Sequence, residues 1–365
     1  MSTEPLDHVD QLSAGTYPSS WYSDRAVYEA ELAKIFRASW QYAGPLDYVR
    51  RPGDYMTTTV GSVPVVVVRG DDDQLRAFVN LCRHRYSVLV EGHGRRKVLQ
   101  CPYHAWTYRL NGTLAGAPRA ARERDFDHSR LSLRPAGVET WGPLVFVNLD
   151  LEAAPARQVW GDILGRYEAT GLMIDRLRFR ERRVYDVEAN WKVATENILE
   201  CYHCPIVHPA YSRLMDLDDY ELETSRYTSI QLTRLRNRDK GEDGEAYDVA
   251  GEVSVGLYAF AFPNFMFNVN PGVGHFHTNH VAPVDLDHAR WVNDFFFVPE
   301  VTEADAAAYV NFQDEVSRED LPTTARAGSG AAVAAAAGIN EGRLMLASEL
   351  TIAHFQGLVS EHLRD

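Results

Sequence analysis

Cysteine is scarce in this chain, and long hydrophobic runs are missing. Only four cysteines occur among 365 residues, too few for a disulfide scaffold at this length. Apolar stretches such as residues 331–339 stop at nine residues, far short of the ~20 that a membrane-spanning helix needs. The first residues carry neither the basic patch nor the apolar segment of a signal peptide. We therefore expect a globular, cytoplasmic protein without a membrane partner.

Basic residues are fewer than acidic residues. The chain has 37 lysines and arginines against 51 aspartates and glutamates, a formal net charge of −14 at pH 7. That balance excludes a chain-wide basic footprint for nucleic acid. Hydrophobic residues make up 45% and charged residues 24%, which excludes a disordered chain. No GxGxxG motif follows a predicted strand, so we expect no nicotinamide or flavin site in this chain.

The pattern of residues divides the chain into three parts, and the predicted class is α+β. Apolar residues follow a helical period over 26–40, within a first part at 1–43. The second part, 44–150, has the short strands and glycine turns of a small all-β unit. Its clearest signals are strands at 55–60, 63–69, 75–81 and 143–149 and a hairpin at Asn111-Gly112.

The third part, 151–365, mixes helices with a large sheet. A helix is predicted over 190–204, and alternating apolar and polar residues over 220–298 predict an antiparallel sheet covered on one face. The chain returns to helix from Thr302. Within that stretch, the Ala/Gly-rich segment 325–338 is expected to be a mobile loop or lid.

Two of the four cysteines stand beside histidines. Cys82-Arg-His84 is followed, after sixteen residues, by Cys101-Pro-Tyr-His104. Two thiolates and two imidazoles suit one tetrahedral zinc ion, although CxxC is the commoner spacing there. They also suit a [2Fe–2S] cluster with the thiolates on one iron and the imidazoles on the other, which would make this part a one-electron relay.

A second group of candidate ligands lies at the end of the helix predicted from Asn190. At 100° per residue, Glu196, Glu200 and His203 fall within an arc of about 60° and would share one face. Pro205 disfavours helix just before it, which lets His208 turn back toward His203. With one carboxylate, two such histidines form the triad of non-haem Fe(II) oxygenases, which leaves positions open for O₂. Taken alone, the two histidines would more often be structural.

Together these residues resemble the α subunits of Rieske non-haem iron oxygenases. The likeness rests on the two Cys/His motifs, on Asn190-Trp-Lys and Glu196-Asn, and on a Tyr-His pair followed by a second histidine after four residues. One departure is Tyr86, where the family mostly has glycine, and it bears on loop geometry. The resemblance covers nearly the whole chain.

The resemblance implies a domain layout. An N-terminal helical segment, 1–43, would pack on the catalytic domain, and residues 44–150 would form the Rieske [2Fe–2S] domain. Residues 151–365 would form a catalytic mononuclear iron domain, whose large antiparallel sheet is flanked by helices in the helix-grip manner.

The resemblance also implies the ligands. The cluster would be held by Cys82, His84, Cys101 and His104. A mononuclear Fe(II) would be held by His203, His208 and the aspartate of Val316-Ser-Arg-Glu-Asp320, with Asp314 as the fallback.

Glu200 occupies the position of a bridging carboxylate between the two metal sites. In the family's head-to-tail homotrimer, His104 of one subunit would reach His203 of the next through Glu200. Electrons from NAD(P)H would arrive through a separate reductase, with or without a ferredoxin.

The substrate expectation is coarser. Glu at position 200, the run Glu-Cys-Tyr-His-Cys and the short chain are similar to the branch that acts on choline, carnitine, glycine betaine and stachydrine. Hydroxylation or N-demethylation of a quaternary ammonium compound would suit an aromatic cavity, although aromatic stripes in a sheet more often form plain core. The candidate aromatic residues are Tyr202, Tyr258, Phe260, Phe262, Phe265 and Phe267.

Other readings stay open. The first alternative is hydroxylation or O-demethylation of an aromatic or natural-product substrate; more remote are a non-enzymatic Rieske electron carrier and a zinc-stabilised binding protein. Cys201 and Cys204 are expected to be buried and inert rather than a zinc site or a redox disulfide. His275, His277 and His280 are expected in structural or pocket-lining roles.

Overall fold

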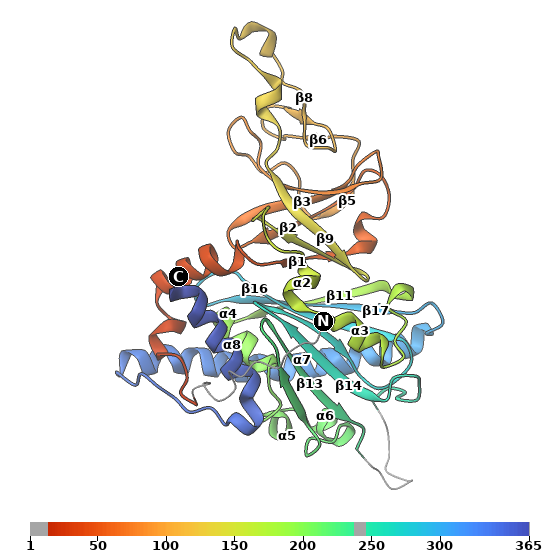
Figure 1. Cartoon of the computed structure of the whole chain (residues 1–365), viewed down its shortest axis with the longest axis vertical. Helices are drawn as coiled ribbons and strands as arrows, with labels where there is room; N and C mark the ends of the chain where they lie inside the picture. Colours follow the sequence, from red (N-terminus) through yellow and green to blue (C-terminus); the bar gives the residue numbers. More distant parts are fainter. Residues whose placement is uncertain (1–13, 237–245, 365) are drawn as a thin grey trace. The chain divides into compact units, whose positions relative to one another are not determined.

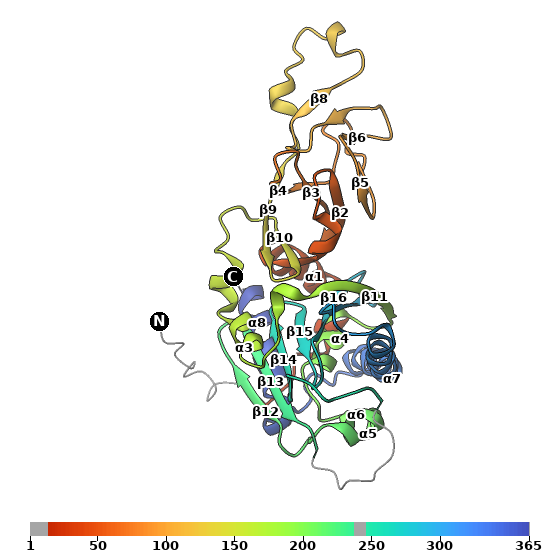
Figure 2. The ribbon, with the colours of Figure 1, turned by 90° about the vertical axis from the view of Figure 1, so that its right-hand side faces the viewer.

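The computed structural model describes residues 14–236 and 246–364. They form two compact units, which Figure 1 and Figure 2 show from two sides. The smaller unit runs from Phe36 to Ala156, and the larger unit joins the chain up to Ile35 with everything from Arg157 onward. The smaller unit is therefore an insertion in the larger one. Within the described part of the chain, no helix is both long enough and apolar enough to cross a membrane.

The smaller unit is built from short antiparallel strands. Its main sheet has the order β1-β10-β9-β4-β3-β2-β5, and a three-stranded sheet has the order β6-β7-β8. The main sheet contains β1 (Gln41–Pro45), β2 (Asp54–Val60), β3 (Val63–Arg69), β4 (Leu75–Val79), β5 (His93–Arg95), β9 (Pro135–Trp141) and β10 (Leu144–Asn148). The second sheet contains β6 (Leu99–Gln100), β7 (Thr107–Tyr108) and β8 (Leu114–Gly116). The four strands predicted from sequence are confirmed as β2, β3, β4 and β10.

Glycine turns set the register of these strands. Val60 pairs with Val63 across the turn at Gly61, whose φ of 59° lies in the left-handed region that glycine adopts at little cost. Gly112, with φ of 84°, closes the hairpin between β7 and β8, and the Asn111 side chain accepts a hydrogen bond from the Thr113 N–H at 3.1 Å. The hairpin predicted from Asn111-Gly112 is therefore confirmed.

The larger unit is organised around one seven-stranded antiparallel sheet. Its order is β11-β17-β16-β15-β14-β13-β12, so six of the seven strands, β12 to β17, follow one another in space as they do in sequence. The strands are β11 (Arg178–Val187), β12 (Glu221–Thr224), β13 (Thr228–Arg234), β14 (Val255–Ala261), β15 (Phe265–Val269), β16 (His275–Pro283) and β17 (Ala289–Phe297). This sheet confirms the alternation predicted over residues 220–298.

Helices cover both faces of that sheet, so the prediction of cover on one face was wrong. Figure 1 shows α7 crossing the strands, and Figure 2 shows α7 on one side of the sheet and α3 on the other. The helices are α1 (Arg25–Glu31), α2 (Ala156–Trp160), α3 (Ile163–Glu168), α4 (Trp191–Ile198), α5 (Cys204–Val207), α6 (Pro209–Leu214), α7 (Glu303–Ala336) and α8 (Leu346–Arg364). The α+β class and the helix-flanked sheet are confirmed.

The Ala/Gly-rich segment is the clearest correction to the predicted elements. Instead of a loop or lid, residues 325–336 continue α7, which runs unbroken to Ala336. Alanine has the strongest helix propensity, and here it outweighs Gly328 and Gly330. The helix also passes through Pro322. Proline lacks a backbone N–H, so the helix has one hydrogen bond fewer there but does not end.

Candidate metal centres and active-site cavity

The first candidate centre lies on two loops of the smaller unit that share one backbone pattern. In the first loop the Cys82 N–H donates to Ser87 O at 2.8 Å, and the Tyr86 N–H donates to Cys82 O at 3.0 Å. In the second, the Cys101 N–H donates to Trp106 O at 2.8 Å, and the Ala105 N–H donates to Cys101 O at 3.1 Å. Two equivalent loops thus present two equivalent Cys/His pairs.

Both loops need a left-handed residue four positions after the cysteine. Tyr86 has φ of 60° and Ala105 has φ of 56°. The left-handed region disfavours residues with a Cβ, which explains why glycine suits this position better than the tyrosine found here. The exposed Tyr86 ring, at 76% of its full accessibility, adds no buried contact in return.

The residues of these loops fit a Rieske cluster. Cys82 and Cys101 are buried and form no disulfide, whereas His84 is exposed and His104 is half-buried, with the centroids of the two imidazole rings 4.6 Å apart. His104 Nδ1 is buried and has no hydrogen-bond partner among the described residues. An unpaired buried nitrogen beside two free thiols is the donor set that a cluster with mixed sulfur and nitrogen ligation requires.

The second candidate centre begins where α4 ends. The Asn190 side chain caps the helix by accepting from the Lys192 N–H at 3.1 Å, and the last helical residue is Ile198. The predicted helix over 190–204 was therefore too long. Glu200 accepts hydrogen bonds from the backbone N–H groups of Tyr202 and His203, and such local bonds compete with helix continuation.

This early end separates two acids that were expected on one face. Glu196 is still in the helix, where its carboxylate accepts from Tyr22 Oη at 2.9 Å and from Gln356 Nε2 at 2.9 Å. Glu200 lies beyond the helix, beside His203. The shared helical face predicted for Glu196, Glu200 and His203 was wrong, and only the last two meet.

Three atoms converge from two parts of the chain. His203 Nε2 and His208 Nε2 are 3.1 Å apart, and Asp320 Oδ1 of α7 lies 3.3 Å from the first and 3.0 Å from the second. Separations near 3 Å are those of neighbouring ligands of one ion bound at about 2.1 Å. Asp320 Oδ1 is also buried, and apart from these two imidazole nitrogens it has no hydrogen-bond partner among the described residues. Asp314, the fallback, bonds instead to Tyr185 and Arg318.

Carboxylates orient both imidazoles. His203 Nδ1 contacts Glu200 Oε1, and His208 Nδ1 lies 2.8 Å from Glu319 Oε2. With each Nδ1 held as a donor, each Nε2 keeps a free lone pair for a metal ion. Glu319 is a functional candidate that the motif contained but sequence reasoning did not single out. Burial raises the pKa of Asp320, but the hydrogen bonds with His203 and His208 outweigh it and leave that pKa below its usual value.

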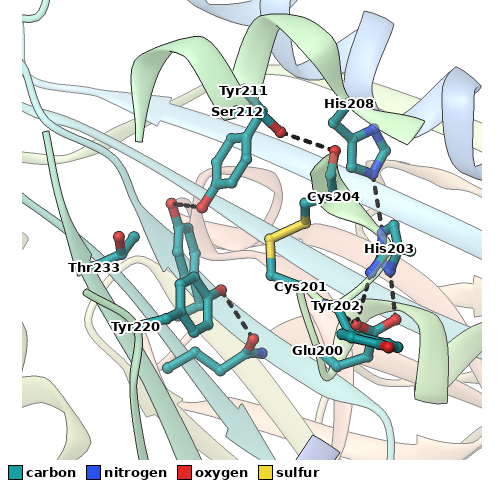
Figure 3. The surroundings of a disulfide bond; sticks show 12 residues. Glu200, Cys201, Tyr202, His203, Cys204, His208, Tyr211, Ser212, Tyr220 and Thr233 are labelled. Carbon is teal, nitrogen blue, oxygen red and sulfur yellow. Dashed lines mark hydrogen bonds and ion pairs between the residues drawn. A yellow bond between two sulfur atoms is a disulfide. The ribbon is translucent and has the colours of Figure 1, made fainter. Parts of the chain in front are cut away.

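The cysteines beside this centre differ from the expectation. Figure 3 shows Cys201 and Cys204 joined by a disulfide on the loop that carries His203. The expectation of two unpaired, inert cysteines was therefore wrong. Cys204 is buried and Cys201 half-buried, and both line the cavity described next.

The triad opens onto a cavity between α7 and the concave face of the sheet. Its wall combines three tyrosines and a tryptophan with amide side chains and His277; Figure 3 shows Tyr211 and Tyr220 among them. The hydroxyls of Tyr211 and Tyr258 are 2.8 Å apart. Burial raises the pKa of Tyr211, Tyr220 and Tyr258, so these phenols stay neutral. The sheet residues that line it include Gln231, Tyr258, Met266, Asn268, Asn270, His277, Asn279 and Trp291.

Of the six aromatic residues predicted near substrate, only Tyr258 lines this cavity. Phe265 and Phe267 point to the opposite face of β15, because alternate residues of a strand face opposite ways. Phe260 and Phe262 pack on Phe355 of α8. Tyr202 is 57% exposed. For five of the six, the expectation does not hold.

His275, His277 and His280, the three histidines of β16, have different surroundings. His277 lines the cavity, His275 stacks on Tyr309 with ring centroids 3.8 Å apart, and His280 pairs with Phe265 on β15. Burial lowers the pKa of His275 to about 4 and that of His277 to about 3, so both are neutral. His277 therefore lines the cavity, and His275 and His280 pack within the larger unit, as expected from the sequence.

Two known protein families match this chain, one over most of the smaller unit and one within the larger unit. Residues 39–140 match the Rieske [2Fe-2S] domain, and residues 174–365 match the ring hydroxylating alpha subunit catalytic domain. This chain belongs to the Rieske oxygenase α subunits. The family carries a Rieske [2Fe–2S] cluster and a mononuclear iron, so both expected cofactors are confirmed. The readings as a mere electron carrier or a zinc-stabilised binding protein are excluded.

Relatives of this Rieske oxygenase span almost its full length. The chloroplastic choline monooxygenase of Spinacia oleracea is 32% identical over 360 residues, covering 96% of this chain and 79% of its own. The carnitine monooxygenase oxygenase subunit of Acinetobacter pittii is 32% identical over 357 residues, covering 96% and 95%.

Solved structures agree. A quaternary ammonium Rieske monooxygenase in complex with L-carnitine superimposes with a TM-score of 0.84 at 29% identity over 99% of both chains. Naphthalene 1,2-dioxygenase with indole bound has a TM-score of 0.77 at 18% identity, covering 96% and 92%, and shows the shared fold alone.

Proposed function

We propose that this Rieske oxygenase hydroxylates or N-demethylates a small quaternary ammonium compound with O₂. The observation that carries the proposal is the cavity, where the triad of His203, His208 and Asp320 opens onto tyrosine and tryptophan rings. Aromatic faces attract a cationic ammonium group. The relatives named for choline and carnitine oxidation support the same substrate class.

The roles of the chain's own residues follow from the geometry. Cys82, His84, Cys101 and His104 would hold the cluster, and His203, His208 and Asp320 would hold the iron. When bound, these groups supply single electrons and activate O₂. Glu200 and Glu319 hold the imidazole rings in place.

We further propose that Glu200 bridges two metal sites in a head-to-tail homotrimer. Its contact with His203 Nδ1 forms one half of the bridge, and the other half would be His104 of a neighbouring subunit. Electrons from NAD(P)H would enter through a separate reductase, with or without a ferredoxin. We place the enzyme in the cytoplasm.

A single turnover tests the substrate class without the reductase. The holoenzyme is reduced chemically, exposed to O₂ and offered a mixed panel of trimethylammonium compounds and aromatics. Formaldehyde or a hydroxylated ammonium product is the expected result. Hydroxylated or O-demethylated aromatics alone would contradict the proposal and favour an aromatic or natural-product substrate.

The control is the same reaction with His203→Ala. This variant is expected to retain the visible spectrum of the Rieske cluster while forming no product. Turnover by His203→Ala would show that the triad is not the reaction site.

A further inference from the structure

Four neutral polar side chains share one part of the cavity wall. Asn268 and His277 face each other across β15 and β16, and Asn279 follows two residues later on the same face. Gln313 lies on α7, seven residues before Asp320 and on the same side, which is about 10 Å along a helix. We call these four residues the amide subsite.

Three atoms of the amide subsite have no protein partner. Asn268 Nδ2, Asn279 Oδ1 and Gln313 Nε2 are all buried and unbonded within the described part of the chain. Asn268 is 2% and Gln313 7% exposed. Leaving a buried polar group unsatisfied costs about 1–3 kcal/mol, so the arrangement calls for a ligand that completes it.

A chain of hydrogen bonds determines what His277 offers. The Tyr211 hydroxyl donates to Tyr258, which donates to Asn270 Oδ1, and Asn270 Nδ2 donates to Tyr309 Oη at 3.1 Å. Tyr309 Oη accepts that bond and has its own hydroxyl proton to donate. We assign this proton to His277 Nδ1, which lies 2.8 Å away. Neutral His277 must therefore carry its own proton on Nε2, as a hydrogen-bond donor.

The three buried unbonded amide atoms and His277 Nε2 together make three donors and one acceptor, and no residue of the subsite carries a charge. A hydroxyl group matches this set because it accepts from donors and also donates one proton, here to Asn279 Oδ1. A carboxylate only accepts, so it would face the Asn279 oxygen without a proton between them.

The charges around the cavity point the same way. Among the described residues that line it there is no lysine or arginine, while Glu200 and Asp320 are both there. An anionic group buried in the amide subsite would find no cationic partner in that lining.

We propose that Asn268, His277, Asn279 and Gln313 bind the neutral hydroxyl of a quaternary ammonium alcohol and select against carboxylated betaines. This inference rests on the proposed function and narrows it. The tyrosine and tryptophan rings hold the ammonium group, and the amide subsite holds the other end of the substrate.

Three ligands that share one trimethylammonium group test the selection by calorimetry on the anaerobic holoenzyme. They are (2-hydroxyethyl)trimethylammonium, the near-isosteric propyltrimethylammonium and (carboxymethyl)trimethylammonium. We expect the alcohol to bind at least about 10-fold more tightly than either of the others, because each leaves part of the subsite unsatisfied. Equal or tighter binding of the carboxylated or the propyl compound would overturn the inference.

The outcomes separate this inference from the proposed function. If none of the three compounds binds and single turnover yields only aromatic products, the substrate class itself is wrong. If all three bind equally, the class stands and the selection by the amide subsite is wrong.

Variants place the effect at the subsite. Gln313→Leu should reduce the advantage of the alcohol over the propyl compound by about 10-fold, with the affinity for the propyl compound little changed. Gln74→Leu, at an exposed glutamine of the smaller unit, is the control and should alter neither affinity. An undiminished advantage in Gln313→Leu, with the Rieske spectrum retained, would contradict the assignment.

Discussion

At the scale of single residues, the candidate iron site depends on imidazoles that neighbouring carboxylates hold in place. Each imidazole of the triad has its Nδ1 on a carboxylate, Glu200 for His203 and Glu319 for His208. Such outer partners set the tautomer and the ring orientation. The motif around Asp320 therefore supplies two functions from adjacent positions, a proposed metal ligand and an orienting carboxylate.

Replacing Asp320 should remove one iron and leave the cluster. We expect Asp320→Asn to contain about two iron atoms per chain instead of about three, with unchanged acid-labile sulfide, because the cluster holds two of each. Activity should fall at least about 100-fold. Iron and sulfide analysis checks this.

The matched control is Asp314→Asn. This carboxylate bonds to Tyr185 and Arg318 and takes no part in the triad. The Asp314→Asn variant should keep full iron content, and loss of iron there with normal iron in Asp320→Asn would reverse the assignment.

The disulfide makes a second prediction at this scale. If unfolded protein is alkylated under a chelator, two cysteines per chain should react before reduction and all four after it, because Cys201 and Cys204 are bonded while Cys82 and Cys101 are free. Mass spectrometry of the alkylated peptides shows which two. Four reactive thiols before reduction would contradict the disulfide, and would match the reducing conditions of a cytoplasm.

At the scale of elements, α4 joins the loop that carries His203 to the N-terminal part of the larger unit. Glu196 of α4 is half-buried and accepts hydrogen bonds from Tyr22, which precedes α1, and from Gln356 of α8. The pKa of Glu196 is raised to about 7, and removal of its carboxyl group from water is the largest cause. The acid is therefore more easily protonated in the folded chain than in the unfolded one.

This shift predicts a pH dependence of stability. A carboxyl group with a raised folded pKa contributes its stability fully below its unfolded pKa and loses it as pH rises through the folded value. Between pH 4.5 and about 7 the free energy of unfolding should fall by about 3 kcal/mol through Glu196 alone.

Thermal unfolding of wild type and Glu196→Gln across this range gives the measurement. The neutral amide should lessen the decline, so the two curves should diverge toward higher pH with the variant relatively more stable. Parallel curves would show that Glu196 titrates normally.

At the scale of the whole molecule, the proposed trimer predicts complementation between damaged subunits. Cys101→Ser should lose the cluster, and His203→Ala should lose the mononuclear iron. If electrons pass between neighbouring subunits, trimers that contain both variants should recover about a third of wild-type activity, because one of the three interfaces in such a ring pairs an intact cluster with an intact iron site.

Co-expression of the two variants with different affinity tags and a two-step purification provides such mixed trimers. Each variant alone should be inactive, and sedimentation should give about three times the chain mass. Inactive mixed trimers with correct metal content would show that electrons do not cross the subunit interface.

The sequence by itself determined the elements whose signals are local. Strand alternation, glycine turns and the Cys/His spacing each involve residues that are close along the chain, so β2, β3, the hairpin at Gly112 and the two loops that carry the Cys/His pairs were predictable. Local signals also misled: the alanine-rich segment continued a helix, and the helix from Trp191 stopped at Ile198 because Glu200 bonds to the backbone.

Only the tertiary structure decided which side chains from distant parts of the sequence come into contact. Asp320 reaches His203 and His208 from more than a hundred residues away, and Glu319 reaches His208 beside it. Strand pairing decided that Asn268, His277 and Asn279, rather than Phe265 and Phe267, face the cavity. Alternation along a strand predicts two faces, but packing against α7 determines which of them becomes the wall of the site.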